Sequence, residues 1–437
     1  MDTRTRTSTD ITRRGDARRP VAADAPAAPA LVYRAGIDGL RALAVVAVVF
    51  ADSGAGWMSG GFLGIEMLFV ISGYLMTTLL VREHRARSRV DLVRFWARRA
   101  RRVLPALLTV LGGVSIFVLV LRPDELHRLG PDVRAALAST TNWHLILSPA
   151  ARAGAAVPSM LQHLWSVAIG VQFAVWWPLL FALLHRRRGL RRLRAVAWLL
   201  AVASAIAMVV VALWLGPVRA FYGTDTRASG LLIGAALGLA VRPGSATAQV
   251  TGAPARRLRV LSLLVLAGLV VILTVSEARS VWLLRGGILL VAILTALMLA
   301  AVVRGDDVDR LFGAVPLRWL GLRSYGIYLW HWPVLIGLGG PATVGRWPNS
   351  VLYLTITVAL ADLTYRFVEV PLCRMRRVRG TGRIGRPSMA VRAMAVACGA
   401  ATVAALLTGQ AAPADATSSA SETDTQRPGH LAAQPAR

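Results

Sequence analysis

The chain has 437 residues, of which 55% are hydrophobic and 16% charged, with a formal net charge of +28 at pH 7. The hydrophobic share exceeds the roughly 45–50% of a soluble globular domain, and the mean hydropathy is +0.56. The sequence contains no lysine, and its arginines fall in blocks between apolar segments. This pattern excludes a soluble domain and argues against nucleic acid as a partner. It predicts an all-α, polytopic membrane bundle.

Residues 1–33 are rich in arginine and contain an Ala/Pro run, without an apolar core of signal-peptide length. We expect a disordered basic arm on the cytoplasmic side, because a basic tail is retained beside an anionic membrane surface.

Apolar segments that approach or exceed the length needed to cross a hydrocarbon layer of about 30 Å come next. We predict about ten core transmembrane helices within residues 34–376. They lie at residues 37–53, 61–81, 103–121, 164–184, 196–214, 227–241, 260–277, 284–303, 322–339 and 351–371. Residues 377–409 are expected to form a basic loop and one additional span, at 389–409. Residues 410–437 are expected to be a disordered extracytoplasmic tail.

Arginine-rich segments follow every second span, at residues 82–102, 186–194, 242–259, 304–323 and 374–386. Since positively charged loops stay on the cytoplasmic side, the alternation places the amino terminus inside and the carboxyl terminus outside. It also places Arg41 near the cytoplasm. The segment from Asn142 to Gln162 is long enough to fold over an outer mouth.

The first two spans carry the charged residues Arg41, Asp52 and Glu66. A charge at the centre of a span costs roughly 2.5–3.5 kcal/mol, so such residues usually mark a functional site. Arg41 and Asp52 are eleven positions apart, which on an α-helix is about three turns and roughly 16 Å. We therefore expect them on one face, near opposite membrane surfaces.

Several motifs occur in a fixed order along the chain. They are Ile37 to Ala44, Gly60 to Tyr74, Arg98 to Pro105, Trp165-Ser166, Gln172-Phe173, Trp177-Pro178, Thr226-Arg227, Ser324-Tyr325 and Tyr328 to Pro333. From about residue 34 to Pro371, the chain resembles the acyltransferase-3 family of bacterial membrane acyltransferases.

The resemblance implies transfer of an acyl group, commonly acetyl, from cytoplasmic acyl-CoA to a hydroxyl outside the membrane. The acceptor would be a glycan, peptidoglycan or a lipid-linked molecule. No bound cofactor or metal is implied, and acyl-CoA would be the donor substrate. The expected location is the bacterial cytoplasmic membrane. Some members append an extracytoplasmic transfer domain of the SGNH type, which we do not find in this sequence, so a separate SGNH-type chain is a candidate partner.

The chain departs from the family pattern at two places. Asp52 stands where the family has a histidine, with ten residues between it and the arginine, and Gly170 and Val171 stand where it has two glutamates. In addition, Glu66 replaces the usual aspartate. Attack by an alcohol on a thioester needs a base, and histidine suits this task because its ordinary pKa of about 6.5 lies near the operating pH.

We name Asp52, Glu66 and His331 as candidate catalytic residues. His331 is the histidine well inside a predicted span, and His163 lies at the start of another. The alternatives are that Asp52 caps its helix in water and that His331 is a hydrogen-bonded packing residue. A catalytically impaired member that acts as an acyl carrier, regulator or scaffold therefore stays open. An unrelated transporter would leave the ordered motifs unexplained.

Four arginines at the start of the third span are candidate donor-binding residues together with Arg41, because guanidinium groups match phosphate oxygens. They are Arg98, Arg99, Arg101 and Arg102; topology alone would also place arginines here. The resemblance assigns a substrate pocket to Ser72, Tyr74, Trp165, Ser166, Gln172, Arg227 and Tyr328. We further expect Arg366 and Glu369 to pair along one helix, and the glycines from Gly230 to Gly238 to allow close helix approach.

Overall fold

The computed structural model describes residues 33–148, 158–240, 252–277, 280–345 and 348–374. Their regular secondary structure is helical, and no strand occurs among them. The predicted all-α class is therefore confirmed. The expectations for residues 1–32 and 375–437, including the additional span at 389–409 and the tail, lie outside the described residues.

The long helices follow one another through most of the chain. They are α1 (Ala35–Asp52), α2 (Gly64–Arg87), α3 (Leu92–Leu121), α7 (Trp165–Trp214), α9 (Thr224–Ala240), α10 (Ala253–Val275), α11 (Ile288–Arg304), α13 (Val315–Gly337) and α15 (Asn349–Thr364). Helix α7 is two helices joined at Gly189, whose φ is 70°. The short helices are α4 (Leu126–Leu137), α5 (Thr141–Leu147), α8 (Pro217–Tyr222), α12 (Asp306–Phe312), α14 (Pro341–Val344) and α16 (Val370–Arg374).

Each of the ten predicted core spans coincides with a helix of the described chain. Seven helices are long and apolar enough to cross a membrane, at 61–87, 92–121, 162–185, 189–214, 253–275, 283–304 and 349–372. The other three predicted spans correspond to α1, α9 and α13. Helix α9 has only 17 residues, and α1 and α13 carry charged and polar side chains.

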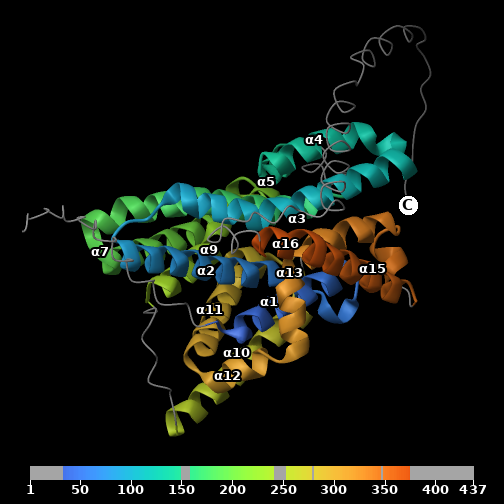
Figure 1. Ribbon diagram of the computed structural model, residues 1–437. Coiled ribbons are helices and arrows are strands. Elements are labelled where there is room, and N and C mark those ends of the chain that lie inside the picture. Colours follow the sequence, from blue (N-terminus) through green and yellow to red (C-terminus); the bar gives the residue numbers. More distant parts are fainter. Residues whose placement is uncertain (1–32, 149–157, 241–251, 278–279, 346–347, 375–437) are drawn as a thin grey trace, which may run out of the picture.

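These three shorter or more polar helices lie at the inside of the bundle. Helix α1 packs against α13, α2, α11 and α12, and α9 packs against α7, α2 and α11. Figure 1 shows α1 in the middle of the molecule with α2, α11 and α13 around it. Polar groups in a membrane protein are stable where neighbouring helices shield them from lipid. The least hydrophobic spans are therefore the ones that can line a site.

Close helix contacts explain the glycines of α9. A Cβ atom at Gly234 would lie 1.9 Å from the carbonyl oxygen of Val70, and one at Gly73 would lie 1.9 Å from that of Leu231. Helices α2 and α9 therefore touch through their backbones, as small residues permit in membrane bundles.

The arginine-rich segment 82–102 is mostly helix and not a loop. Helix α2 continues to Arg87 and α3 begins at Leu92, so only residues 88–91 connect them. Asp91 caps α3 by accepting a hydrogen bond from the backbone amide of Arg94 at 2.9 Å, which is a common way to begin a helix.

Helices α4 and α5 lie outside the main layer, beside one end of α3 (Figure 1). The segment expected as a loop from Asn142 to Gln162 begins inside α5, and its residues 149–157 lie outside the described chain. Below, the two ends of the bundle are named by the α1 residues that mark them, the Arg41 end and the Asp52 end.

Candidate functional site

The structure brings two of the candidate catalytic residues into contact. Asp52 is the last residue of α1, and His331 lies in the second half of α13. The Nε2 atom of His331 is 3.1 Å from Oδ2 of Asp52. The imidazole is fully buried, whereas the Asp52 side chain keeps 25% of its surface exposed. The imidazole is therefore enclosed by protein, whereas the Asp52 carboxylate is partly accessible to another molecule.

Hydrogen-bond geometry shows which nitrogen of His331 carries a hydrogen. The Nδ1 atom of His331 lies 2.6 Å from the carbonyl oxygen of Tyr328. A carbonyl oxygen only accepts hydrogen bonds, so Nδ1 carries a hydrogen. The contact between Nε2 and Asp52 then requires one further proton, held either by the imidazole or by the carboxyl group. An imidazole and a carboxyl group in hydrogen-bond contact are a combination that suits acid–base catalysis.

The rings of His163, in the 3-10 turn before α7, and of Tyr328 in α13 lie against the imidazole. The ring of His163 stands edge-on to that of His331, with centroids 5.5 Å apart. The hydroxyl of Tyr328 donates to the carbonyl oxygen of His163 at 2.7 Å, and it lies 2.7 Å from Oγ of Ser166. Since the single Tyr328 hydrogen is used on the carbonyl, Ser166 is the donor in the second contact. These bonds fix α13 against the start of α7.

Glu66 forms a separate, deeper ion pair with Arg227. Oε2 of Glu66 lies 3.3 Å from a terminal nitrogen of Arg227, and the two side chains are 0% and 1% exposed. The guanidinium faces the rings of Phe69, Trp165 and Phe221 at 5.7, 5.4 and 5.1 Å. Within the described residues, no hydrogen bond or ion pair joins Glu66 to Asp52. Arg227 lies within electrostatic range of Tyr328, so this ion pair is linked to the Asp52–His331 pair through Tyr328.

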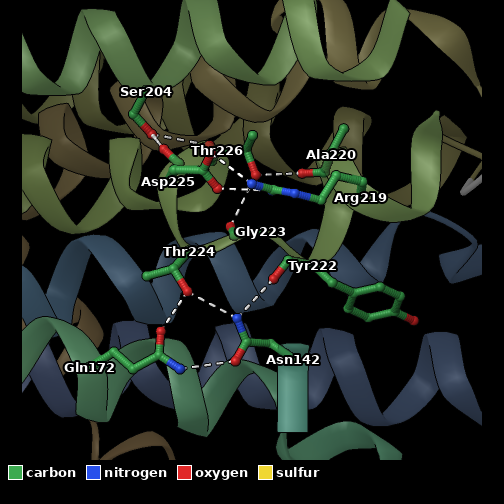
Figure 2. A network of polar contacts seen from close by, with 10 residues as sticks. All are labelled: Asn142, Gln172, Ser204, Arg219, Ala220, Tyr222, Gly223, Thr224, Asp225 and Thr226. Carbon is green, nitrogen blue, oxygen red and sulfur yellow. Dashed lines mark hydrogen bonds and ion pairs between the residues drawn. The ribbon is translucent and has the colours of Figure 1, made fainter. Parts of the chain in front are cut away.

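Gln172 belongs to a polar network that joins α5, α7 and the start of α9 (Figure 2). Its amide nitrogen donates to Oδ1 of Asn142 at 3.0 Å, and its amide oxygen accepts from the hydroxyl of Thr224. Asn142 in turn donates to the carbonyl of Tyr222 at 3.1 Å and to Thr224 at 2.9 Å. Gln172 therefore positions the Tyr222 segment and does not itself face His331.

The same figure shows how the turn between α8 and α9 is closed. Arg219 makes two hydrogen bonds of 2.9 Å to the carboxylate of Asp225. Thr226 donates to the carbonyls of Ala220 and Gly223. This turn presents Tyr222, whose ring lies 5.3 Å from that of Trp165, next to the candidate site.

A basic cluster forms at the Arg41 end. Arg41 bonds to Asp38 at 3.2 Å with only 14% of its side chain exposed, and Arg102 and Glu369 lie within electrostatic range of it. Arg99 interacts with Arg41, Arg102 and Tyr325, and its buried Nε atom has no hydrogen-bond partner. Three predicted donor-binding arginines, Arg41, Arg99 and Arg102, are thus gathered from two helices.

Other predicted residues do not join these groups. Arg98 bonds instead to Glu83 of α2 at 2.7 Å, and Arg101 is exposed on α3. In the described part of the chain, no hydrogen bond or ion pair connects Ser72 or Tyr74 to Asp52 or His331; Tyr74 is buried between α2 and α9.

The prediction that Arg366 pairs with Glu369 is wrong. Arg366 bonds to Asp362, one helical turn back, at 2.7 Å, and Asp362 also accepts a hydrogen bond from Arg323 at 2.6 Å. Glu369 lies within electrostatic range of Arg41 and Arg102 instead.

Four residues of the polar network and the basic cluster were not predicted from the sequence. They are Tyr222, Asn142, Thr224 and Tyr325. Tyr222 and Thr224 lie just before the Thr226-Arg227 motif, and Tyr325 lies within Ser324-Tyr325, so proximity to a motif was a usable signal. Asn142 lies next to no such motif.

Gly170, at the position of one absent glutamate, has open space around it. A Cβ atom at Gly170 would meet no atom within 4 Å. Gly170 follows Ser166 by one turn of α7, so the replacement leaves open space and does not reflect tighter packing.

Comparisons with known proteins agree with the motifs. A family model described as an acyltransferase domain matches residues 34–366. Peptidoglycan O-acetyltransferase OatA of Listeria monocytogenes is 37% identical over 354 residues, covering 78% of this chain and 56% of that protein. O-acetyltransferase OatA of Staphylococcus aureus is 32% identical over 344 residues, covering 78% and 57%.

A third relative is the putative peptidoglycan O-acetyltransferase YrhL of Bacillus subtilis. It is 35% identical over 349 residues, covering 78% of this chain and 55% of that protein. The chain thus spans just over half the length of these relatives, and no solved structure matches it. The family match over residues 34–366 and the apolar helices together show that this chain is a bacterial membrane protein that belongs to the acyltransferase-3 family.

Proposed function

We propose that this protein is an O-acetyltransferase that moves an acetyl group from cytoplasmic acetyl-CoA to a hydroxyl of an extracytoplasmic carbohydrate, with peptidoglycan as the acceptor. The observation that carries the proposal is the contact between Asp52 and His331. It supplies an imidazole at the position where the chain has lost the family histidine. The names of the OatA and YrhL relatives support the choice of acceptor.

The basic cluster at the Arg41 end is the proposed donor site. Arg41 lies near the carboxylates of Asp38 and Glu369, and Arg102 lies near Glu369, whereas Arg99 interacts with Arg41, Arg102 and Tyr325. Three guanidinium groups thus stand beside two carboxylates. Their forked N–H groups suit the phosphates of CoA. The arginine-rich segments at this end of the helices support a cytoplasmic orientation.

The proposed reaction takes place at the Asp52 end. The reaction starts from the pair without its shared proton, with an ionised Asp52 and a neutral imidazole. The acceptor oxygen attacks the thioester carbonyl carbon while this pair takes the hydroxyl proton. The C–S bond then breaks, and the pair returns the proton to the departing CoA thiolate. Arg41 lies in the second turn of α1 and Asp52 is its last residue, so the flexible pantetheine arm would run along this helix from the phosphates to the reaction centre.

The decisive test is transfer of labelled acetyl from acetyl-CoA into extracytoplasmic glycan by membranes that contain the full chain. We expect transfer with the native protein, loss in Asp52→Ala, and recovery of part of the activity in Asp52→His. Asp124→Ala is the matched control, because Asp124 is an exposed acid in the turn before α4.

Two outcomes would contradict the proposal. Full transfer by Asp52→Ala would remove the pair from the mechanism. Absence of transfer from the native chain, with activity gained in Asp52→His, would show a preserved donor path without a working base. That result would favour an acyl carrier, regulator or scaffold.

A further inference from the structure

A cavity lies apart from the Asp52–His331 pair, at the Asp52 end of the bundle. It has a volume of about 500 Å³ and lies between the end of α3, helices α4 and α5, and residues 158–162. Its size is that of a pocket for a small organic ligand, for which roughly 300–1,000 Å³ is typical.

The lining of this cavity is polar and chemically varied. It includes the basic residues Arg122 and Arg128, the acids Glu125 and Asp132, and the amide of Gln162, above apolar side chains such as Leu129. Hydroxyl groups both donate and accept hydrogen bonds, so a mixture of guanidinium, carboxylate and amide groups complements a sugar.

The wall of the cavity is held in place by specific bonds. Asp132 of α4 accepts a hydrogen bond from the hydroxyl of Ser159 and pairs with His144 of α5 at 3.1 Å. The indole nitrogen of Trp332 donates to the carbonyl of Ser159 at 2.8 Å. Helices α4 and α13 therefore hold Ser159 directly, and α5 supports this contact through His144 and Asp132.

Neighbouring residues link the cavity wall to the Asp52–His331 pair. Gln162 lines the cavity, and the next residue, His163, has its ring against that of His331. Gln162 also donates to the hydroxyl of Tyr222 at 3.4 Å. Trp332, which holds the wall, follows His331 directly in α13.

One basic group in the lining is available for an anion. Arg122 bonds to Glu125 at 3.0 Å. Arg128 is exposed, and within the described part of the chain it makes no ion pair or hydrogen bond. A guanidinium in this state can hold a carboxylate by charge-assisted hydrogen bonds.

We propose that this cavity binds the acceptor glycan next to the sugar that receives the acetyl group, and that Arg128 holds a carboxylate of that glycan. The inference rests on the proposed function and names its acceptor subsite. The ligand class is a polyhydroxylated, carboxylate-bearing carbohydrate such as a strand that contains N-acetylmuramic acid.

The test is glycan binding by the full chain in lipid nanodiscs, without acetyl-CoA. The probe is a tetrasaccharide of alternating N-acetylglucosamine and N-acetylmuramic acid, and chitotetraose is the uncharged comparison. We expect Arg128→Gln and Gln162→Ala to weaken tetrasaccharide binding by about tenfold, the effect of losing one good polar contact. Arg134→Gln should bind normally, because Arg134 is exposed on the same helix but does not line the cavity.

Chitotetraose should bind the native chain more weakly than the tetrasaccharide, and Arg128→Gln should remove this difference. The same affinity in native protein and Arg128→Gln, or no tetrasaccharide binding by the native chain, would overturn the proposal. Asp52→Ala separates it from the proposed function, since this variant should lose transfer and keep binding. If the native chain binds the tetrasaccharide through Arg128 but transfers no acetyl group, the subsite stands and the proposed activity fails.

Discussion

The imidazole of His331 and the carboxylate of Asp52 lie 3.1 Å apart, although 279 positions separate them in the chain. One comes from the middle of α13 and the other from the end of α1. Each alone has an ordinary explanation, as a packing histidine or as a helix-end acid. Together they form a hydrogen-bonded pair, in which the Tyr328 carbonyl already uses the Nδ1 hydrogen.

His331→Gln is expected to lower the acetyl-transfer rate by about 10²- to 10⁴-fold, the usual contribution of a general acid–base group. Glutamine keeps a polar side chain for the Tyr328 carbonyl but cannot exchange a proton. The measurement is the initial rate of labelled acetyl transfer at saturating acetyl-CoA. Val315→Ala is a control on the same helix, because Val315 lies 81% exposed at the start of α13. An unchanged rate in His331→Gln would rule out the imidazole as the base.

Glu66→Ala is expected to destabilise the protein by about 3 to 5 kcal/mol, because it leaves the Arg227 charge buried without its partner. The double variant Glu66→Leu with Arg227→Met should regain most of this loss, since apolar residues can replace a buried ion pair. Thermal unfolding of the purified protein in one detergent measures both. A single variant as stable as the native protein would mean that Arg227 is hydrated.

If the stable double variant retains acetyl transfer, the Glu66–Arg227 pair is structural. If it is folded but inactive, the pair also supports the reaction.

Two glycine substitutions should have opposite effects on stability. Gly234→Ala places a Cβ atom 1.9 Å from the Val70 carbonyl oxygen, so α2 and α9 must separate, at a cost of about 1–3 kcal/mol. Gly170→Ala meets no atom within 4 Å and should stabilise α7 by up to about 1 kcal/mol through helix propensity. Unfolding midpoints of the two variants, compared in the same detergent, test this difference; equal midpoints would contradict the close contact.

The contact between α4 and α5 should weaken as the pH rises. The hydrogen bond to Asp132 raises the pKa of His144 above its usual value, although burial and Arg134 oppose the shift. A raised folded-state pKa gives stabilisation that is complete below the ordinary histidine pKa of about 6.5 and is lost as the pH passes through the raised value. Hydrogen exchange of the α5 amides, corrected for intrinsic rates, should therefore increase severalfold from pH 6 to pH 8.

His144→Gln removes the titrating group, so exchange of α5 in this variant should vary little with pH. A native protein with pH-independent α5 protection would show that the His144–Asp132 contact does not stabilise this region.

The positions of the membrane helices followed from the sequence. Their signal is local, since a run of apolar residues of membrane length is helical in lipid whatever its neighbours are. The charged residues Arg41, Asp52 and Glu66 were recognisable for the same reason, because each interrupts such a run. The helix ends were less predictable: α3 begins at Leu92, and arginine-rich residues expected in a loop continue the helix into the polar region.

The sequence by itself thus determined the all-α membrane class, the family and the residues that carry unusual chemistry. Only the tertiary structure decided which of them meet. In the folded chain, Asp52 contacts His331 and Glu66 contacts Arg227. Arg98 bonds to Glu83, and Arg366 bonds to Asp362. The physical reason is that helix formation depends on neighbours along the chain, whereas these contacts depend on the packing and rotation of helices far apart in sequence.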